Sequence, residues 1–192
     1  MSPAPTVNTI IQKIQDISEY TGRLISWLSL LMVLITFCIV VFRYGFNTGW
    51  IAMQESVMYL YAISFLLGIA YTYKHDGHVR VDIFYTNMSH HTKAWVNLLG
   101  ILFLLIPMTV FIFYSSWGYV MDSWSVLEES GAAGGLPFVY LLKSNILLMA
   151  ILLINEAVAQ LLINIQILFS TDKGFVNNEL ESKNSTSDGL EV

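Results

Sequence analysis

The sequence contains little charge, little proline and a single cysteine. Asp, Glu, Lys and Arg make up 12% of its 192 residues, whereas 55% are hydrophobic. Soluble domains carry about 25% charged residues, so this composition, with a mean hydropathy of +0.61, predicts a protein embedded in lipid. The formal net charge is -5, and no basic stripe runs along the chain, which argues against a nucleic-acid partner.

Residues needed for common site chemistry are also missing. The glycine cluster, Gly131 to Gly135, is not followed by the Lys of a phosphate-binding loop. No nucleophile stands beside a recognisable base, so we expect no enzyme activity. Cys38 has no disulfide partner within the chain and is expected to be a small buried hydrophobe.

The four histidines all fall between the second and third apolar stretches. A haem-binding anchor would need axial ligands in facing spans, so we expect no cofactor. His75, Asp76 and His78, with Asp82, could offer metal ligands. A solvated loop is the expected state there, because no rigid element positions a third ligand.

Four apolar stretches are each long enough to cross a bilayer, which takes about 20 helical residues. Each is expected to be a helix, because backbone amides in hydrocarbon must pair within their own segment. The expected fold class is an all-α integral membrane protein with four transmembrane helices and a transmembrane domain over residues 24–170. The predicted spans cover residues 24–46, 51–73, 95–117 and 137–159.

Lysine and arginine gather on one side of the predicted membrane. The opposite side has Arg43 alone, while Lys143 lies inside the fourth span. The positive-inside rule places the basic side in the cytoplasm, so both termini are expected inside. The residues on that side are Lys13, Arg23, Lys74, Arg80, Lys93, Lys173 and Lys183.

Three segments outside the spans have patterns of their own. Residues 1–23 carry Ile10, Ile14 and Ile17 at helical spacing, which predicts a cytoplasmic amphipathic helix lying in the interface. A second interfacial helix is expected at about residues 78–92. Residues 171–192 are polar without periodicity and are expected to form a disordered tail.

Proline and glycine positions predict where the last two spans bend and begin. Pro107 is expected to bend the third span. Apolar residues at helical spacing up to Leu127 predict that this helix continues past the membrane. The glycine cluster then breaks it, and Pro137 suits the first turn of the fourth span.

Three charged residues fall inside predicted spans, where each costs about 2.5 to 3.5 kcal/mol on insertion scales and so usually has a partner. Glu55 and Lys143 are expected to pair with each other or to face another subunit. Glu156, near the cytoplasmic end of span four, is expected to reach interfacial water. One such residue at each end does not make an ion pathway.

A stripe of small residues runs along one face of span two at Ser64, Gly68 and Thr72. Such stripes let helices approach closely, either within the bundle or against another subunit. Four spans without a polar pathway predict a scaffold that acts through a larger membrane partner.

Several short motifs occur in order from the first span to the fourth. They are Arg43-Tyr44-Gly45-Phe46-Asn47, Trp50, Glu55, Phe65 to Ala70, Lys74, His78-Val79-Arg80-Val81-Asp82, Gly134-Gly135-Leu136-Pro137 and Lys143. In this order they resemble the small permease subunits of tripartite ATP-independent periplasmic (TRAP) transporters, of the DctQ type. Two positions depart from the family pattern: many members have two acids at Gln54-Glu55 and Leu-Pro at Met88-Ser89.

The resemblance implies a secondary transporter in which a periplasmic solute-binding protein delivers an organic acid, of the carboxylate or 2-oxoacid type. A large membrane subunit would carry it inward with a sodium gradient, and the small subunit would enlarge the fixed part of this elevator-type carrier. Alternatives are a haem- or quinone-binding anchor of a respiratory enzyme and an independent small channel. The resemblance also implies which residues stabilise the bundle or contact another subunit. The candidates are Arg43, Trp50, Glu55, Ser64, Gly68, Thr72, His78, Asp82 and Lys143.

Overall fold

The computed structural model describes residues 5–78, 85 and 88–169, and the elements in this part of the chain are all helical. Four continuous helical stretches, 8–45, 51–74, 90–125 and 139–169, are long and apolar enough to cross a membrane. The expected all-α fold with four spans is confirmed. In order, the elements are α1 (Pro5–Gly45), α2 (Ile51–Lys74), α4 (His90–Gly100), the π-helical turn η1 (Ile101–Leu105), α5 (Ile106–Ser125) and α6 (Val139–Phe169).

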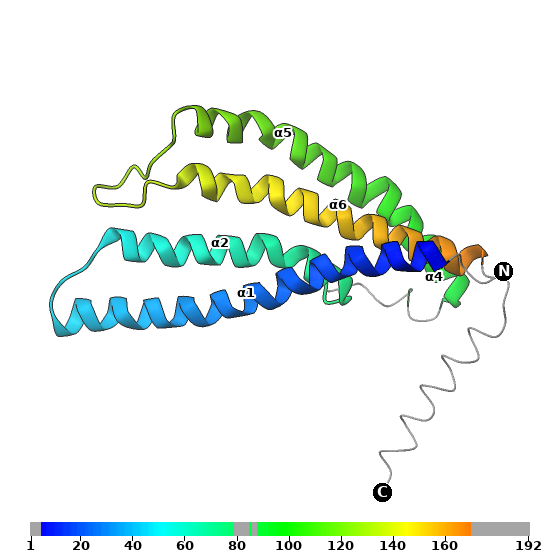
Figure 1. Ribbon diagram of the computed structural model, residues 1–192, viewed down its shortest axis with the longest axis horizontal. Coiled ribbons are helices and arrows are strands. Elements are labelled where there is room, and N and C mark those ends of the chain that lie inside the picture. The colour runs from blue at the N-terminus through cyan, green and yellow to red at the C-terminus, as the bar shows by residue number, and fades with distance from the viewer. Residues whose placement is uncertain (1–4, 79–84, 86–87, 170–192) are drawn as a thin grey trace, which may run out of the picture.

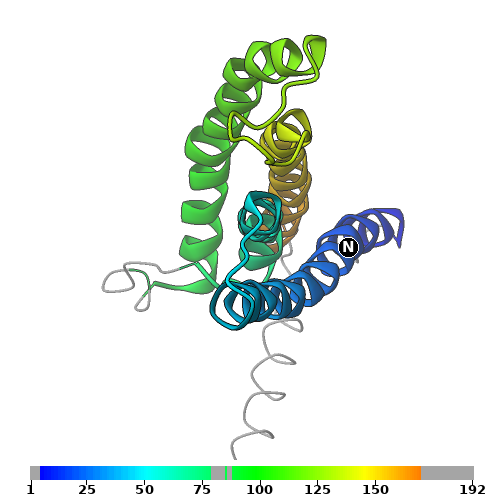
Figure 2. The same ribbon diagram turned by 90° about the vertical axis from the view of Figure 1, so that its left-hand side faces the viewer.

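The helix α6 is the centre of the bundle. It packs against α1, α2, α4, η1 and α5, and α2 also packs against α1. Figure 1 shows the four long stretches side by side, and the end-on view in Figure 2 places α2 next to both α1 and α6. The buried residues of α6 are Leu147, Met149, Ala150, Leu153, Glu156, Ala157, Ala159 and Asn164.

The bundle has two ends that different segments form (Figure 1). The start of α1, the end of α2, the start of α4 and the end of α6 lie at one end, which we call the terminal end. The connections 46–50 and 126–138 lie at the other, which we call the loop end. Most polar contacts between helices are made at these two ends.

Three helices are followed by a residue with left-handed φ: Asn47 after α1, Asp76 after α2 and Leu127 after α5. After α2, Asp76 has φ 57° and the Gly77 N–H bonds the Thr72 carbonyl at 2.9 Å. After α5, Leu127 has φ 49° and the Glu128 N–H bonds the Ser123 carbonyl at 3.0 Å. Both are Schellman turns, which satisfy carbonyls that a helix end leaves free.

The third span contains a π-helical turn just before its proline. In η1 the Ile106 N–H bonds the Ile101 carbonyl, five residues back. Pro107 lacks an N–H and its ring would crowd the carbonyl four residues earlier in a regular helix. The wider π turn accommodates the ring, and the helix curves through this region (Figure 1).

The start of the chain differs from the expected arrangement. Residues 5–23 are not a separate element, because α1 runs unbroken from Pro5 to Gly45. The buried residues of its first part are Ile11, Ser18 and Gly22, while Ile10 and Ile17 are each nearly half exposed. The position of this segment at a membrane surface stays a prediction.

Other boundaries also differ from expectation. The fourth helix begins at Val139, so Pro137 precedes it, and it continues to Phe169. Most of the interfacial helix expected at 78–92, and the tail 171–192, lie outside the described residues; positions 90–92 instead open α4, where Ser89 accepts a hydrogen bond from the Thr92 N–H at 3.2 Å. Cys38 is exposed rather than buried.

Candidate functional site

Glu55 ties α2 to the connection between α5 and α6. Its Oε1 accepts a hydrogen bond from the Ser130 hydroxyl, and its Oε2 accepts one from the Leu136 N–H at 2.6 Å. Gly135 lies against this contact, because a Cβ built there would be 2.8 Å from Glu55 Oε1. We call Glu55, Ser130, Gly135 and Leu136 the loop junction.

The expected pairing of Glu55 with Lys143 is wrong. Lys143 instead forms an ion pair with Glu128 and lies 3.9 Å from the centroid of the Tyr119 ring, which is a cation–π contact. Glu128 follows α5 and Tyr119 belongs to it, so Lys143 connects α5 with α6. Trp124 reinforces this connection by donating its Nε1–H to the Ser144 hydroxyl at 2.8 Å.

Glu128 lies in the connection after α5, outside the spanning helices. The Lys143 ammonium that donates to its carboxylate holds the pKa of Glu128 below its ordinary value of 4.5. The carboxylate is therefore ionised at neutral pH and keeps the ion pair formed.

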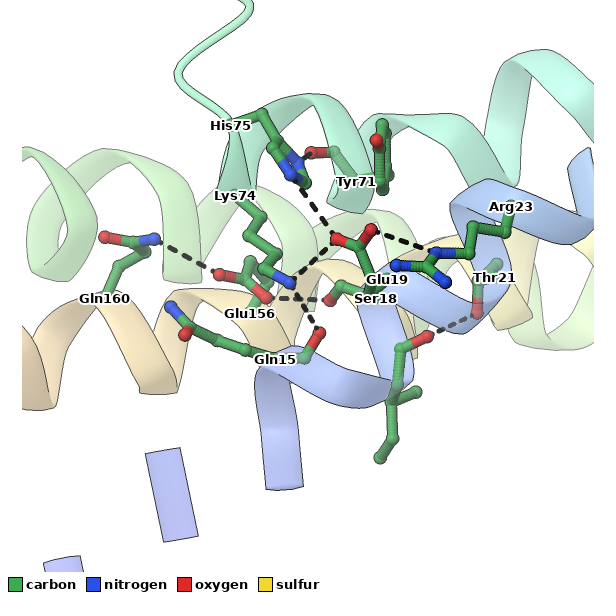
Figure 3. Close-up of polar contacts among 11 residues, drawn as sticks. Gln15, Ser18, Glu19, Thr21, Arg23, Tyr71, Lys74, His75, Glu156 and Gln160 are labelled. Atoms are coloured by element: carbon green, nitrogen blue, oxygen red, sulfur yellow. Dashed lines mark hydrogen bonds and ion pairs between the residues drawn. The ribbon is translucent and has the colours of Figure 1, made fainter. Parts of the chain in front are cut away.

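Glu156 is the most buried charged side chain among the described residues. It has no exposed surface, although we expected it to reach interfacial water. Its Oε2 accepts a hydrogen bond from the Ser18 hydroxyl at 2.7 Å and its Oε1 one from Gln160 at 3.2 Å (Figure 3). The contact joins the first part of α1 to α6.

A second group of charges joins α1 to α2 beside Glu156 (Figure 3). Lys74 donates to Glu19 Oε2 and to the Gln15 carbonyl, both at 3.0 Å. His75 Nε2 lies 3.4 Å from the same Glu19 oxygen. We call this set the terminal junction: Gln15, Ser18, Glu19, Lys74, His75, Glu156 and Gln160.

Gly22 of α1 lies tightly against Tyr71 of α2, whereas the stripe on α2 makes no such contact at Gly68. A Cβ built at Gly22 would collide with the Tyr71 ring, 2.6 Å from its Cε2. A Cβ built at Gly68 meets no described atom within 4 Å outside its own helix backbone. The stripe therefore does not bring two helices of this bundle together at Gly68, and contact with another subunit remains a proposal.

Of the two hydroxyl groups in the stripe, the Thr72 hydroxyl is hydrogen-bonded within α2 and the Ser64 hydroxyl is not. Thr72 donates its hydroxyl to the Gly68 carbonyl at 2.9 Å. The Ser64 hydroxyl is buried and has no hydrogen-bond partner among the described residues. The described part of the bundle therefore supplies no hydrogen bond to the Ser64 hydroxyl.

The remaining candidates lie near the ends of helices. Arg43 is exposed in the last turn of α1, where a cation suits the helix dipole. Trp50 packs its ring 5.4 Å from the Phe42 ring and is 56% exposed. His78 lies 6.3 Å from the Tyr73 ring, and Asp82 falls outside the described residues.

The sequence reasoning missed most of the terminal junction. Ser18, Glu19 and the nearby Gly22 belong to a segment that the sequence predicts to lie apart from the bundle. Ser18 and Gly22 are four residues apart, which places them on one face of α1. That spacing, with a carboxylate inside an apolar run at position 156, was the available signal.

The arrangement supports cohesion between helices rather than chemistry on a ligand. Each carboxylate in the two junctions already accepts hydrogen bonds from neighbouring elements. Within the described part of the chain, no three His, Cys, Asp or Glu side chains lie close enough to hold a metal ion.

Comparison with known proteins assigns the chain to a family. A family model described as "Tripartite ATP-independent periplasmic transporters, DctQ component" matches residues 32–166, which is more than half of the chain. Comparisons with curated proteins and with solved structures gave no match. The match includes the loop junction and leaves out the first part of α1. The chain belongs to the DctQ family, the small membrane subunits of TRAP transporters.

Proposed function

We propose that this chain braces the large membrane subunit of a TRAP transporter while that subunit carries an organic acid inward. The acid, a carboxylate or 2-oxoacid, would be delivered by a periplasmic solute-binding protein and driven by a sodium gradient. The observation that carries the bracing role is that the Glu55 and Glu156 carboxylates accept hydrogen bonds from other segments of the bundle. Both hold helices together, which supports a rigid body rather than a moving carrier.

The exposed surface of α1 supports a partner in the membrane. Its most apolar window has no buried residue, and large side chains such as Trp27 and Phe37 are more than 60% exposed. Lipid alone can cover such a surface, but a brace also needs a broad apolar face for its partner. The open Gly68 face of α2 offers a second place for close helix contact.

The proposed orientation has both termini in the cytoplasm of a bacterial cell. Lysine and arginine at the terminal end support it, since Lys13, Arg23 and Lys74 all lie there. The loop 126–138 would then face the periplasm. That placement would bring the loop junction to the side from which the solute-binding protein approaches.

Reconstitution into liposomes tests the role. The chain alone, the large subunit alone and the two together would each be assayed for sodium-driven uptake of carboxylates presented by the binding protein. We expect uptake with both subunits, weaker or no uptake with the large subunit alone, and none with this chain alone. Uptake by this chain alone would refute the proposal, as would undiminished uptake without it.

A further inference from the structure

A cavity of about 930 Å³ lies at the terminal end, between the end of α2, the start of the third span and α6. Its wall has two zones. One is polar and includes Lys74, His75, Asn97, Gln160 and Asn164. The other is apolar and includes Ile101, Leu104, Leu105, Met108, Ile163 and Ile167.

The polar zone contains a buried amide with an unused acceptor. Asn164 is only 5% exposed, and its Nδ2 donates to the Gln160 carbonyl at 2.7 Å. Its Oδ1 accepts no hydrogen bond from the described residues. Asn164 lines the cavity, so this oxygen is available to a donor within it.

A second amide offers the opposite group. Asn97 Oδ1 accepts a hydrogen bond from the Tyr85 hydroxyl at 3.1 Å, which leaves its own N–H groups for an acceptor in the cavity. Lys74, His75 and the Asp76 carboxylate also line this zone, and Lys74 is shared with Glu19. A ligand with both a donor and an anionic acceptor matches this zone.

The apolar zone is formed where the third span departs from a regular helix. The η1 turn lies in the wall, and Gly100 precedes it without a side chain. A Cβ built at Gly100 meets no described atom within 4 Å. Leu104 is 73% exposed, so this side of the cavity opens outward, in the direction from which lipid reaches a spanning helix.

We propose that the cavity binds one phosphatidylethanolamine molecule. Its ammonium would donate to Asn164 Oδ1, and its phosphate would accept from Asn97 and face Lys74. One acyl chain would follow η1 and leave the cavity beside Leu104. Water could satisfy the amides but would gain nothing from the apolar wall, whereas a phospholipid matches both zones and is abundant around four membrane spans. This inference rests on the membrane location and not on the bracing role.

The test uses the full-length chain purified in detergent, stripped of lipid and titrated with palmitoyl-oleoyl phosphatidylethanolamine in mixed micelles. Native mass spectrometry counts bound lipid. We expect one molecule per chain, and about tenfold weaker binding for Asn164→Leu, which removes one buried hydrogen bond. Gly100→Leu fills the cavity and should weaken binding at least as much.

Two matched variants serve as controls. Asn145→Leu changes another α6 asparagine that donates to its own helix, and Gly118→Leu changes another glycine of the third span with open space at its Cβ. Neither residue lines the cavity, so both should bind like the unchanged chain.

Equal binding by all variants would overturn the proposal, as would absence of stoichiometric binding to the unchanged chain. If Gly100→Leu fails to fold, the comparison of Asn164→Leu with Asn145→Leu decides. Uptake by the reconstituted transporter is measured separately, so failure of the lipid site and failure of the bracing role are distinguishable.

Discussion

At the scale of single residues, the loop junction depends on the absence of a side chain at Gly135. A Cβ there would be 2.6 Å from the Ser130 Cβ as well as 2.8 Å from Glu55 Oε1. We expect Gly135→Ala to separate Glu55 from the loop and to destabilise the chain by about 1 to 3 kcal/mol, as overpacking commonly does. Hydrogen exchange at the Leu136 amide should accelerate.

Gly131→Ala is the control for this change. A Cβ at Gly131 meets no described atom within 4 Å, so the loop should keep its protection. Equal exchange at Leu136 in both variants would contradict the proposed contact. Thermal unfolding in detergent, monitored by circular dichroism, supplies the stability difference.

The Glu128–Lys143 ion pair is expected to make the stability of the folded chain depend on pH. Because Lys143 lowers the pKa of Glu128 in the folded protein, the ion pair's contribution is complete above the ordinary value of 4.5. It is lost as pH falls from there through the lowered folded value. The unchanged chain should therefore unfold at a higher temperature than Glu128→Gln at pH 6, and the gap should close towards pH 3.

The measurement is a series of thermal unfolding curves for both proteins at each pH. The gap is expected to be modest, since the Glu128 side chain is 37% exposed and solvent screens the pair. A gap that stays constant down to pH 3 would show that titration of Glu128 does not contribute.

At the scale of helices, substitution by Leu is expected to affect the stability of the isolated chain differently at two glycines. Gly22→Leu should force α1 away from Tyr71 and lower the stability of the isolated chain by several kcal/mol. Gly68→Leu should leave the isolated chain folded, because its Cβ points into open space. If the α2 stripe contacts the large subunit, Gly68→Leu should nevertheless reduce co-purification of that subunit.

The readouts are thermal unfolding of each variant alone and the yield of the two-subunit complex after affinity purification. Complex yield equal to that of the unchanged chain would remove Gly68 from the interface. Retained stability in Gly22→Leu would contradict the close packing of α1 on α2.

The helices were predictable from the sequence, whereas the contacts between them were not. Long apolar runs predict helices because hydrocarbon leaves the backbone no other partner, and all four runs are helical. The choice of Glu128 over Glu55 by Lys143 depends on how the 126–138 connection folds back onto α6. The Ser18–Glu156 contact joins residues far apart in the chain. Helical spacing indicates which residues share a face of a helix, but not which other helix that face meets.

At the scale of the whole molecule, the two junctions close the bundle from opposite ends. The terminal junction joins α1, α2 and α6, and the loop junction joins α2 to the connection between α5 and α6. Because α2 is held at both ends, sliding of α2 along its neighbours would break one junction or the other. Contacts at both ends of the bundle support the proposed role as a brace.

Two matched serine substitutions test whether the junctions act independently. Ser18→Ala and Ser130→Ala each remove a hydroxyl that donates to a carboxylate, Glu156 or Glu55. Ser18→Ala should cost about 1 to 3 kcal/mol, because Glu156 is fully buried and loses one donor. Ser130→Ala should cost less, since Glu55 keeps the Leu136 N–H.

The double variant should lose the sum of the two, because sites at opposite ends of a bundle share no partner. Ser115→Ala is the control, since that exposed hydroxyl donates to its own helix at 2.7 Å and should change stability little. Denaturant or thermal unfolding of the four variants and the unchanged chain in one detergent gives the comparison. A loss of stability in the double variant well beyond the sum of the two single losses would mean that the ends are coupled through the helices. The bundle would then unfold as one cooperative unit, and the two junctions would not act independently.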